Sequence, residues 1–279
     1  MYDIISSLLS DKNNGIMNFK AFSFCHILYL LLIIGSIILV LFLYKNKSQE
    51  QKNKLINITV ILALCLYIAD FFLMPFSYGY INIDKLPFHL CTSMSIMCVL
   101  SRYTKFFAKF KTSFTILGLV GAMMYIVYPA GVPEADGYSY RIVQTVIYHG
   151  LMIAQGVFSI AFKDLDLRWN TLKYDLISIV SLALWAYLGN TFYSGVVTKP
   201  CDCVEGCTEV ITIYNYDLNW FFVKHDALYI IPDDIDIYIA PFAMVIVIFG
   251  MCALIRFLSI IVLSLFDKKA NNIIQHKCC

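Results

Sequence analysis

Residues 22–43 read FSFCHILYLLLIIGSIILVLFL, a run that contains no Asp, Glu, Lys or Arg. At a rise of about 1.5 Å per residue, about 20 apolar residues span the ~30 Å hydrocarbon core of a bilayer as a helix. The whole chain of 279 residues shares this character, with 60% hydrophobic and 14% charged residues and a mean hydropathy of +0.73. These values lie outside the range of soluble globular proteins. They predict an all-α, polytopic membrane protein.

Six further apolar stretches follow the first, and the third of the seven is short. Its Pro87 is expected in a first helical turn, where the missing N–H costs nothing, and the span is expected to continue toward Phe110. Because no repeat or composition shift marks a second unit, residues 1–279 are predicted to form a single transmembrane domain. The predicted spans are Phe22 to Leu43, Leu55 to Ser77, Pro87 to Ser101, Thr112 to Ala130, Arg141 to Phe162, Tyr174 to Tyr193, and Ala240 to Phe266.

The charges of the connections predict the orientation, since Lys and Arg near span ends stay on the cytoplasmic side. The first, third and fifth connections and the C-terminal tail are basic. The connection before Pro87 has only Lys85 as a basic residue, and the other two connections are acidic. The N-terminus is therefore predicted outside and the C-terminus inside. The net charge of +2 sums two faces of opposite sign and gives no indication of nucleic-acid binding.

The connection from Ser194 to Ile239 is long for a membrane protein and is predicted to form a small extracellular cap. Residues 209–216 have the composition of a strand. The cap also holds Cys201, Cys203 and Cys207, for which one disulfide with a spare thiol explains the pattern better than a metal site, because a closed zinc site needs about four ligands. The acidic, aromatic cap is a candidate surface for an extracellular partner. Cys278 and Cys279 end the chain and are candidate lipidation sites.

Polar residues within the spans cluster at one depth. With 1.5 Å per residue from the outer boundary, side chains of five helices fall within about 5–12 Å of the outer surface. A single polar side chain in a span usually bonds a neighbouring helix, but a shared depth favours a functional site. Gln155 and Arg256 lie deeper, and the long stem of Arg256 is expected to reach the headgroups. The residues at the shared depth are His26, Asp70, Cys91, Gln144, His149 and Asn190.

Cys91 and His149 have the chemistry of a nucleophile and its base. An imidazole can take the thiol proton and generate the thiolate that attacks an acyl carbonyl. Asp70 or Asn190 could orient the imidazole through its other nitrogen, and the sequence does not choose between them. His89 is either an oxyanion donor or a partner of a loop carbonyl; it lies about 200° around the helix from Cys91 and does not act with it on one target.

The hexapeptide Leu86-Pro87-Phe88-His89-Leu90-Cys91 resembles the L-P-x-H-L-C signature of the YwaF-type family of bacterial integral membrane proteins, which is related to the eukaryotic transmembrane protein 164 acyltransferase. Residues 24–28 around His26, Tyr148-His149-Gly150 and residues 189–193, GNTFY, agree with the same family in the same order. The resemblance covers residues 20–193. It implies that a Cys and a His form the active pair of a phospholipid acyl transfer, and these positions are Cys91 and His149 here.

The predicted function is therefore thiol-dependent acyl transfer on a phospholipid or lysolipid in the outer leaflet of the cell membrane, without a cofactor or metal. With water as the acceptor, the same Cys-His pair would make the protein a lipid hydrolase. The predicted partners are membrane lipids. A transporter or channel would use the same polar layer as part of a substrate path, but it predicts polar groups through the full depth of the membrane. A scaffold that binds an extracellular partner through the cap is the third hypothesis.

Overall fold

The computed structural model describes residues 18–78, 85–129, 135–193, 195–200, 210–216, 219–222 and 233–277. Seven α-helices occupy these ranges, which confirms the all-α prediction. Cys201, Cys203, Cys207, Cys278 and Cys279 lie outside the described residues. The helices are α2 (Phe24–Tyr44), α3 (Gln49–Tyr78), α4 (Leu90–Tyr103), α5 (Lys111–Val127), α6 (Tyr140–Ala161), α7 (Leu172–Tyr193) and α8 (Asp233–Lys277), with short 3-10 turns η2 (Phe107–Phe110), η3 (Trp169–Thr171) and η4 (Trp220–Phe222).

Six of these helices are long and apolar enough to cross a membrane. The exception is α4, whose 14 residues reach only about 21 Å. The predicted short span from Pro87 to Ser101 corresponds to α4, but it begins three residues before the observed helix and ends two residues before that helix ends. Pro87 lies in the turn before the helix. Its carbonyl accepts hydrogen bonds from two side chains, and these bonds hold the turn in place. The helix also ends at Tyr103 and does not continue to Phe110.

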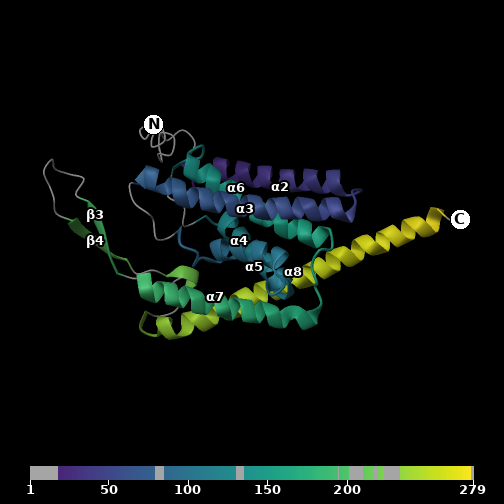
Figure 1. Cartoon of the computed structure of the whole chain (residues 1–279). Coiled ribbons are helices and arrows are strands. Elements are labelled where there is room, and N and C mark those ends of the chain that lie inside the picture. Colours follow the sequence, from purple (N-terminus) through teal and green to yellow (C-terminus); the bar gives the residue numbers. More distant parts are fainter. Residues whose placement is uncertain are drawn as a thin grey trace.

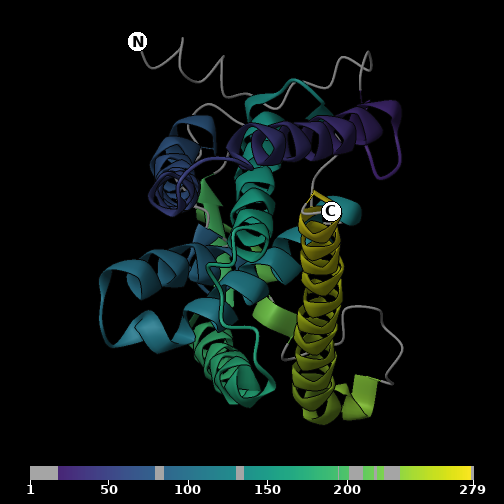
Figure 2. The same cartoon turned by 90° about the vertical axis from the view of Figure 1, so that its right-hand side faces the viewer.

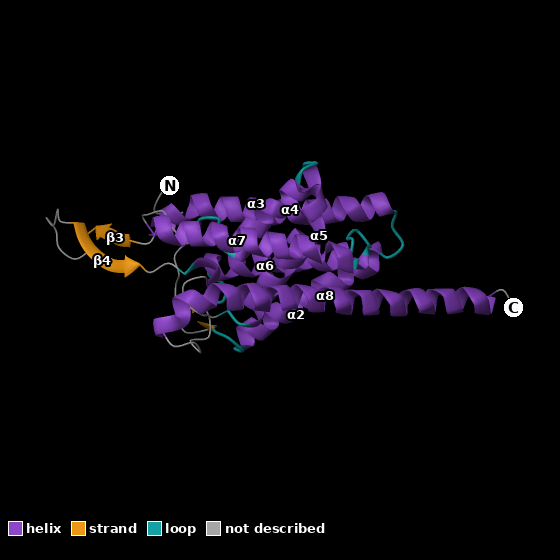
Figure 3. Ribbon diagram, turned by 90° about the horizontal axis from the view of Figure 1, so that it is seen from below, coloured by secondary structure: helices purple, strands orange, loops and turns teal. Residues whose placement is uncertain are grey.

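The helices run side by side, with α5 and α6 at the centre (Figure 1). Viewed along the bundle, α2 and α3 lie at one side and α7 at the opposite side (Figure 2). Most side chains of α5 are buried, whereas the side chains of α2 are largely exposed and apolar, as expected for a helix that faces lipid. The helix α8 extends beyond its neighbours at the C-terminal end (Figures 1 and 3).

Two helix starts show how the sequence sets their position. Ser23 caps α2 and accepts a hydrogen bond from the His26 backbone N–H at 3.3 Å, and Ser139 caps α6 in the same way through Ile142 at 3.5 Å. A serine hydroxyl at this position satisfies one of the free N–H groups of the first turn. Both capped starts lie at the end of the bundle from which the β-hairpin projects (Figure 1).

Strands occur only in short antiparallel pairs within the described residues. The pair β1 (Asn18–Phe19) and β2 (Ala135–Asp136) joins the start of α2 to the start of α6. The pair β3 (Gly195–Pro200) and β4 (Val210–Tyr216) forms a hairpin that projects from the bundle after α7 (Figure 3). The strand predicted over residues 209–216 is confirmed. The described parts of the predicted cap are this hairpin, residues 219–222 with η4, and the first turns of α8.

Candidate functional site

The Leu86–Cys91 turn is held by aromatic stacking. The Phe88 ring stacks on Trp185 of α7 at 4.8 Å and on Trp220 of η4 at 4.7 Å between centroids. The Pro87 carbonyl accepts hydrogen bonds from Ser93 Oγ at 2.6 Å and from Trp185 Nε1 at 2.8 Å. Three separate parts of the chain therefore fix the turn that delivers Cys91.

Gly189 and Asn190 support the same turn from α7. A side chain on Gly189 would collide with the Phe88 ring, so only glycine permits this close approach. The Asn190 amide donates to the Trp220 carbonyl at 3.1 Å and its Oδ1 accepts from the Trp220 N–H at 2.8 Å. Asn190 thus holds the indole that stacks on Phe88. The Asn190 side chain therefore bonds to the Trp220 backbone and does not orient His149.

Cys91 lies in the first turn of α4 and is half-buried. Its Sγ would be 3.1 Å from a Cβ atom placed on Gly121, so the thiol packs against α5 where that helix has no side chain. Tyr125 follows one turn later on the same face of α5. The thiol therefore packs on the side of α5 that also carries Tyr125.

The orientation of His149 is fixed by two contacts. Its Nδ1 lies 2.9 Å from the Thr145 carbonyl, and its ring stacks on Tyr125 with centroids 4.1 Å apart and an interplanar angle of 10°. A carbonyl only accepts, so Nδ1 carries the proton and Nε2 of the neutral ring carries the lone pair. Among the described residues, no group hydrogen-bonds to Nε2, and no hydrogen bond joins it to Cys91. Tyr125 lies beside both residues.

Tyr148 adds a hydroxyl that sequence reasoning missed. Its ring meets His149 edge-on at 4.9 Å, and its buried hydroxyl has no hydrogen-bond partner within the described part of the chain. A buried polar atom without a partner is rare and calls for an explanation. The signal in the sequence was its position next to His149.

The other predicted residues are held elsewhere. Asp70 is buried and forms an ion pair with Lys85 at 2.7 Å, so a cation already satisfies it. His26 uses both nitrogens: Nδ1 accepts from the Phe22 N–H at 2.9 Å and Nε2 donates to the Ile126 carbonyl at 2.7 Å. These bonds attach the start of α2 to the end of α5.

Gln144 and His89 lie at the margins of the Cys91 and His149 region. Gln144 is buried, and its Oε1 accepts a long hydrogen bond of 3.4 Å from Thr145, the residue whose carbonyl orients His149. His89 is exposed, and its ring lies edge-on to Trp220 at 6.2 Å. Within the described residues, no three His, Cys, Asp or Glu side chains are grouped as metal ligands.

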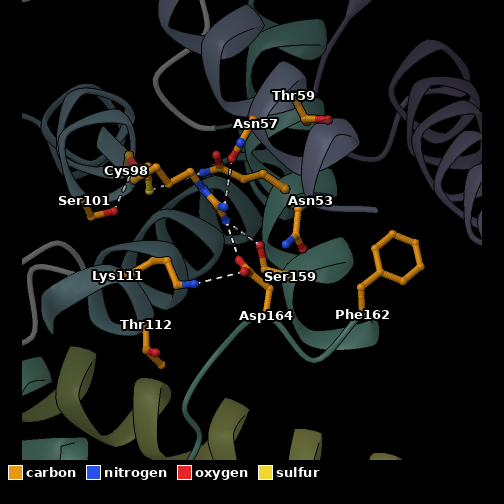
Figure 4. Close-up of polar contacts among 12 residues, drawn as sticks. Asn53, Asn57, Thr59, Cys98, Ser101, Lys111, Thr112, Ser159, Phe162 and Asp164 are labelled. Carbon is orange, nitrogen blue, oxygen red and sulfur yellow. Dashed lines mark hydrogen bonds and ion pairs between the residues drawn. The ribbon is translucent and has the colours of Figure 1, made fainter. Parts of the chain in front are cut away.

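A second polar layer, which the sequence did not reveal, lies at the opposite end of the bundle. Arg102 donates to Asp164 at 2.7 Å, to Ser159 at 3.2 Å and to Asn57 at 3.1 Å, and Lys111 also binds Asp164 at 2.9 Å. Figure 4 shows Asn57, Lys111, Ser159 and Asp164 converging on this point. Four segments of the chain are joined there.

Arg256 belongs to the same end and corrects the expectation that it reaches the headgroups. It is fully buried and binds Asp175 through two hydrogen bonds of 2.7 and 2.8 Å. Its third nitrogen donates to the Asp166 carbonyl and to Thr171, and Ser113 donates to Asp175. A planar guanidinium satisfied on all sides is a structural clamp between α7 and α8.

Comparison with known proteins identifies the family of the chain. A model described as TMEM164 family matches residues 21–262. No curated protein and no solved structure matches significantly. The matched range includes the Leu86–Cys91 turn, His149 and Asn190, as well as both polar layers. Since the match extends over most of the bundle, this multi-pass membrane protein belongs to the TMEM164 family.

Proposed function

We propose that this protein catalyses acyl transfer on a phospholipid or lysolipid in the outer leaflet of the cell membrane, with Cys91 as nucleophile and His149 as general base. The observation that supports this most directly is the state of His149. One ring nitrogen is bonded to a backbone carbonyl, and the other presents a lone pair with no protein partner in the described residues.

Cys91 supplies the complementary group. Its thiol is half-buried at the start of α4, and Gly121 and Tyr125 connect its position to that of His149. The hydrogen bond between a catalytic nucleophile and its base often shortens only when the substrate is bound. We expect a bound lipid ester to bring the Cys91 thiol and His149 Nε2 into contact in this way. The ester bonds of a phospholipid lie just below its headgroups, which matches the depth of about 6 Å predicted for Cys91.

The Cys91 thiol and His149 Nε2 account for every proton transfer of the proposed reaction. His149 Nε2 takes the thiol proton, and the sulfur attacks the ester carbonyl to form a thioester as the C–O bond of the donor lipid breaks. The proton passes from Nε2 to the departing alkoxide. An acceptor hydroxyl then gives its proton to Nε2 and attacks the thioester, which restores the thiol. The unpaired Tyr148 hydroxyl is the candidate donor to the oxyanion in both steps.

The test compares two cysteines of the same helix. Purified protein in vesicles that contain a phospholipid with a fluorescent acyl chain and an unlabelled lysolipid is assayed for transfer of that chain. Cys91→Ser is expected to lower the rate at least about 100-fold while leaving the Tm unchanged. Cys98→Ser, two turns along α4, is expected to keep the activity, because that buried thiol only accepts from Gln155. Full activity of the Cys91→Ser protein would exclude the proposal, and release of free fatty acid would assign a hydrolase.

A further inference from the structure

A shallow hollow lies at the opposite end of the bundle from Cys91. It has a volume of about 670 Å³ and is open to the surroundings. It lies at the side where α3 begins, which the loop charges predict to be cytoplasmic. Six lining residues come from α3 and one from α4: Glu50, Asn53, Lys54, Asn57, Ile58, Ile61 and Tyr103.

The six residues of α3 form one face of the helix, because they follow the spacing i, i+3, i+4, i+7, i+8 and i+11. The character of this face changes along the helix. The first four side chains are polar, and the next two, Ile58 and Ile61, are 45% and 40% exposed. Over about 16 Å the face thus passes from polar to apolar, as a phospholipid does from its headgroup to its acyl chain.

The carboxamides of the hollow have fixed orientations. Arg102 has only donors, so the contact of 3.1 Å from its Nη1 is made to Asn57 Oδ1 and the NH₂ group of Asn57 points elsewhere. Asn53 likewise uses its Oδ1 to accept from Gln49 at 3.0 Å. No acceptor for either NH₂ group is found among the described residues. Figure 4 shows Asn53 and Asn57 on neighbouring turns of the same helix.

The charges around the hollow favour an anion. Lys54 and Glu50 carry opposite charges in the lining itself. Behind Asn57, Arg102 and Lys111 carry two positive charges and Asp164 one negative charge, which leaves a net charge of +1. The two amide NH₂ groups and the Lys54 ammonium are donors suited to phosphate oxygens.

We propose that this hollow binds the phosphate of a glycerophospholipid in the leaflet at the start of α3, with Asn53, Lys54 and Asn57 as donors and an acyl chain along Ile58 and Ile61. The site is separate from the proposed catalytic residues: Asp70, one of the predicted outer-layer residues, lies 13 positions beyond Asn57 on the same helix, or about 20 Å. The lipid would seal the membrane-facing side of the Arg102 and Asp164 cluster.

The test uses the full chain, purified in detergent, and measures binding of phosphatidylglycerol by native mass spectrometry. The double variant Asn53→Ala, Lys54→Gln is expected to weaken binding about tenfold, because it removes two donors to a charged group. Both side chains are at least partly exposed, so the fold should tolerate the change. The matched control is Lys47→Gln, an exposed lysine of the loop before α3, which should leave binding unchanged.

Two competitors separate a lipid from a free phosphate. Diacylglycerol with the same chains lacks the phosphate and is expected not to displace phosphatidylglycerol. Glycerol 3-phosphate lacks the chains and is also expected not to displace it. The phosphate site would be overturned if the Lys47→Gln control weakened phosphatidylglycerol binding as much as the double variant does. Unchanged binding to the double variant, or displacement of phosphatidylglycerol by diacylglycerol, would overturn it as well. Displacement by glycerol 3-phosphate would overturn the assignment to a lipid.

Discussion

The two polar layers of this bundle differ in residue types and in how completely their groups are paired. In the layer around Arg102 and Arg256, both guanidinium groups bind carboxylates, and hydroxyl or amide groups fill most remaining positions. In the layer around Cys91, the buried Tyr148 hydroxyl has no hydrogen-bond partner in the described residues, and His149 binds a backbone carbonyl through Nδ1.

This difference separates groups that hold helices together from groups available to a ligand. Paired charges in a membrane bundle join helices at a small net gain, and the loss of one partner leaves an isolated charge in an apolar environment. Unpaired reactive groups give up hydrogen bonds that the fold could have used. We therefore expect changes in the first layer to affect stability and changes in the second layer to affect chemistry.

The largest effect is expected for Arg256→Met. The change leaves the fully buried Asp175 without its cation, which costs about 3–5 kcal/mol and lowers the Tm by roughly 10 °C. Thermal unfolding in detergent measures it. The double variant Arg256→Met, Asp175→Leu should recover most of the loss, because no charge remains unpaired. If the single variant unfolds at the wild-type temperature, the Asp175 pair does not stabilise the bundle.

His149→Ala tests the unpaired layer. It is expected to slow the labelling of Cys91 by a lipophilic thiol-directed electrophile about 100-fold, since the base that takes the thiol proton is lost. Mass spectrometry of the labelled peptide gives the rate. His26→Ala provides the contrast: both of its nitrogens bind backbone groups, so it should lower the Tm and leave the labelling rate unchanged. The reverse pattern would exchange the roles of the two histidines.

Tyr148→Phe is expected to have a smaller effect. Removal of an oxyanion donor should lower kcat about tenfold or more, with little change in KM or in Cys91 labelling. The Tm should stay constant or rise, because the variant removes a buried hydroxyl without a partner. Tyr67→Phe is the control, since that hydroxyl donates to the Lys85 carbonyl at 2.7 Å and its loss should lower the Tm. An unchanged kcat for Tyr148→Phe would remove this residue from the mechanism.

The sequence predicted the fold through length and hydropathy, and these properties are local. The starts of α2 and α6 are predicted to within two residues because the apolar runs begin close to the observed helix starts, which Ser23 and Ser139 cap. The third span was predicted to start at Pro87, three residues too early, because the turn at Pro87 is fixed by hydrogen bonds from Ser93 and from Trp185, a residue 98 positions away. Pairing over such distances cannot be read from a single sequence.

The sequence predicted the depth of the candidate site residues in the membrane, but not the direction in which each side chain points from its helix. The rise per residue gave the level of each side chain, and it placed His26, Asn190 and His149 in one layer. The direction in which a side chain points around its helix depends on packing, and packing commits His26 to Ile126 and Asn190 to Trp220. The same limit explains Arg256, because its partner Asp175 lies 81 positions earlier in the chain.

The smallest effect is expected where a carboxylate pair is exposed. Asp166 binds Arg168 in the loop between α6 and α7, and their side chains are 40% and 75% exposed. The guanidinium lowers the pKa of Asp166, so the pair stabilises the fold above about pH 4 and this contribution is lost as the pH falls through the folded pKa.

Asp166→Asn should lower the Tm by only about 1–2 °C at pH 7, because solvent screens the pair. Lowering the pH below the folded pKa of Asp166 or adding 0.5 M salt should remove the difference between variant and wild type, whereas salt should not change the larger loss caused by Arg256→Met. Equal losses from both variants at high salt would show that burial does not distinguish the two pairs.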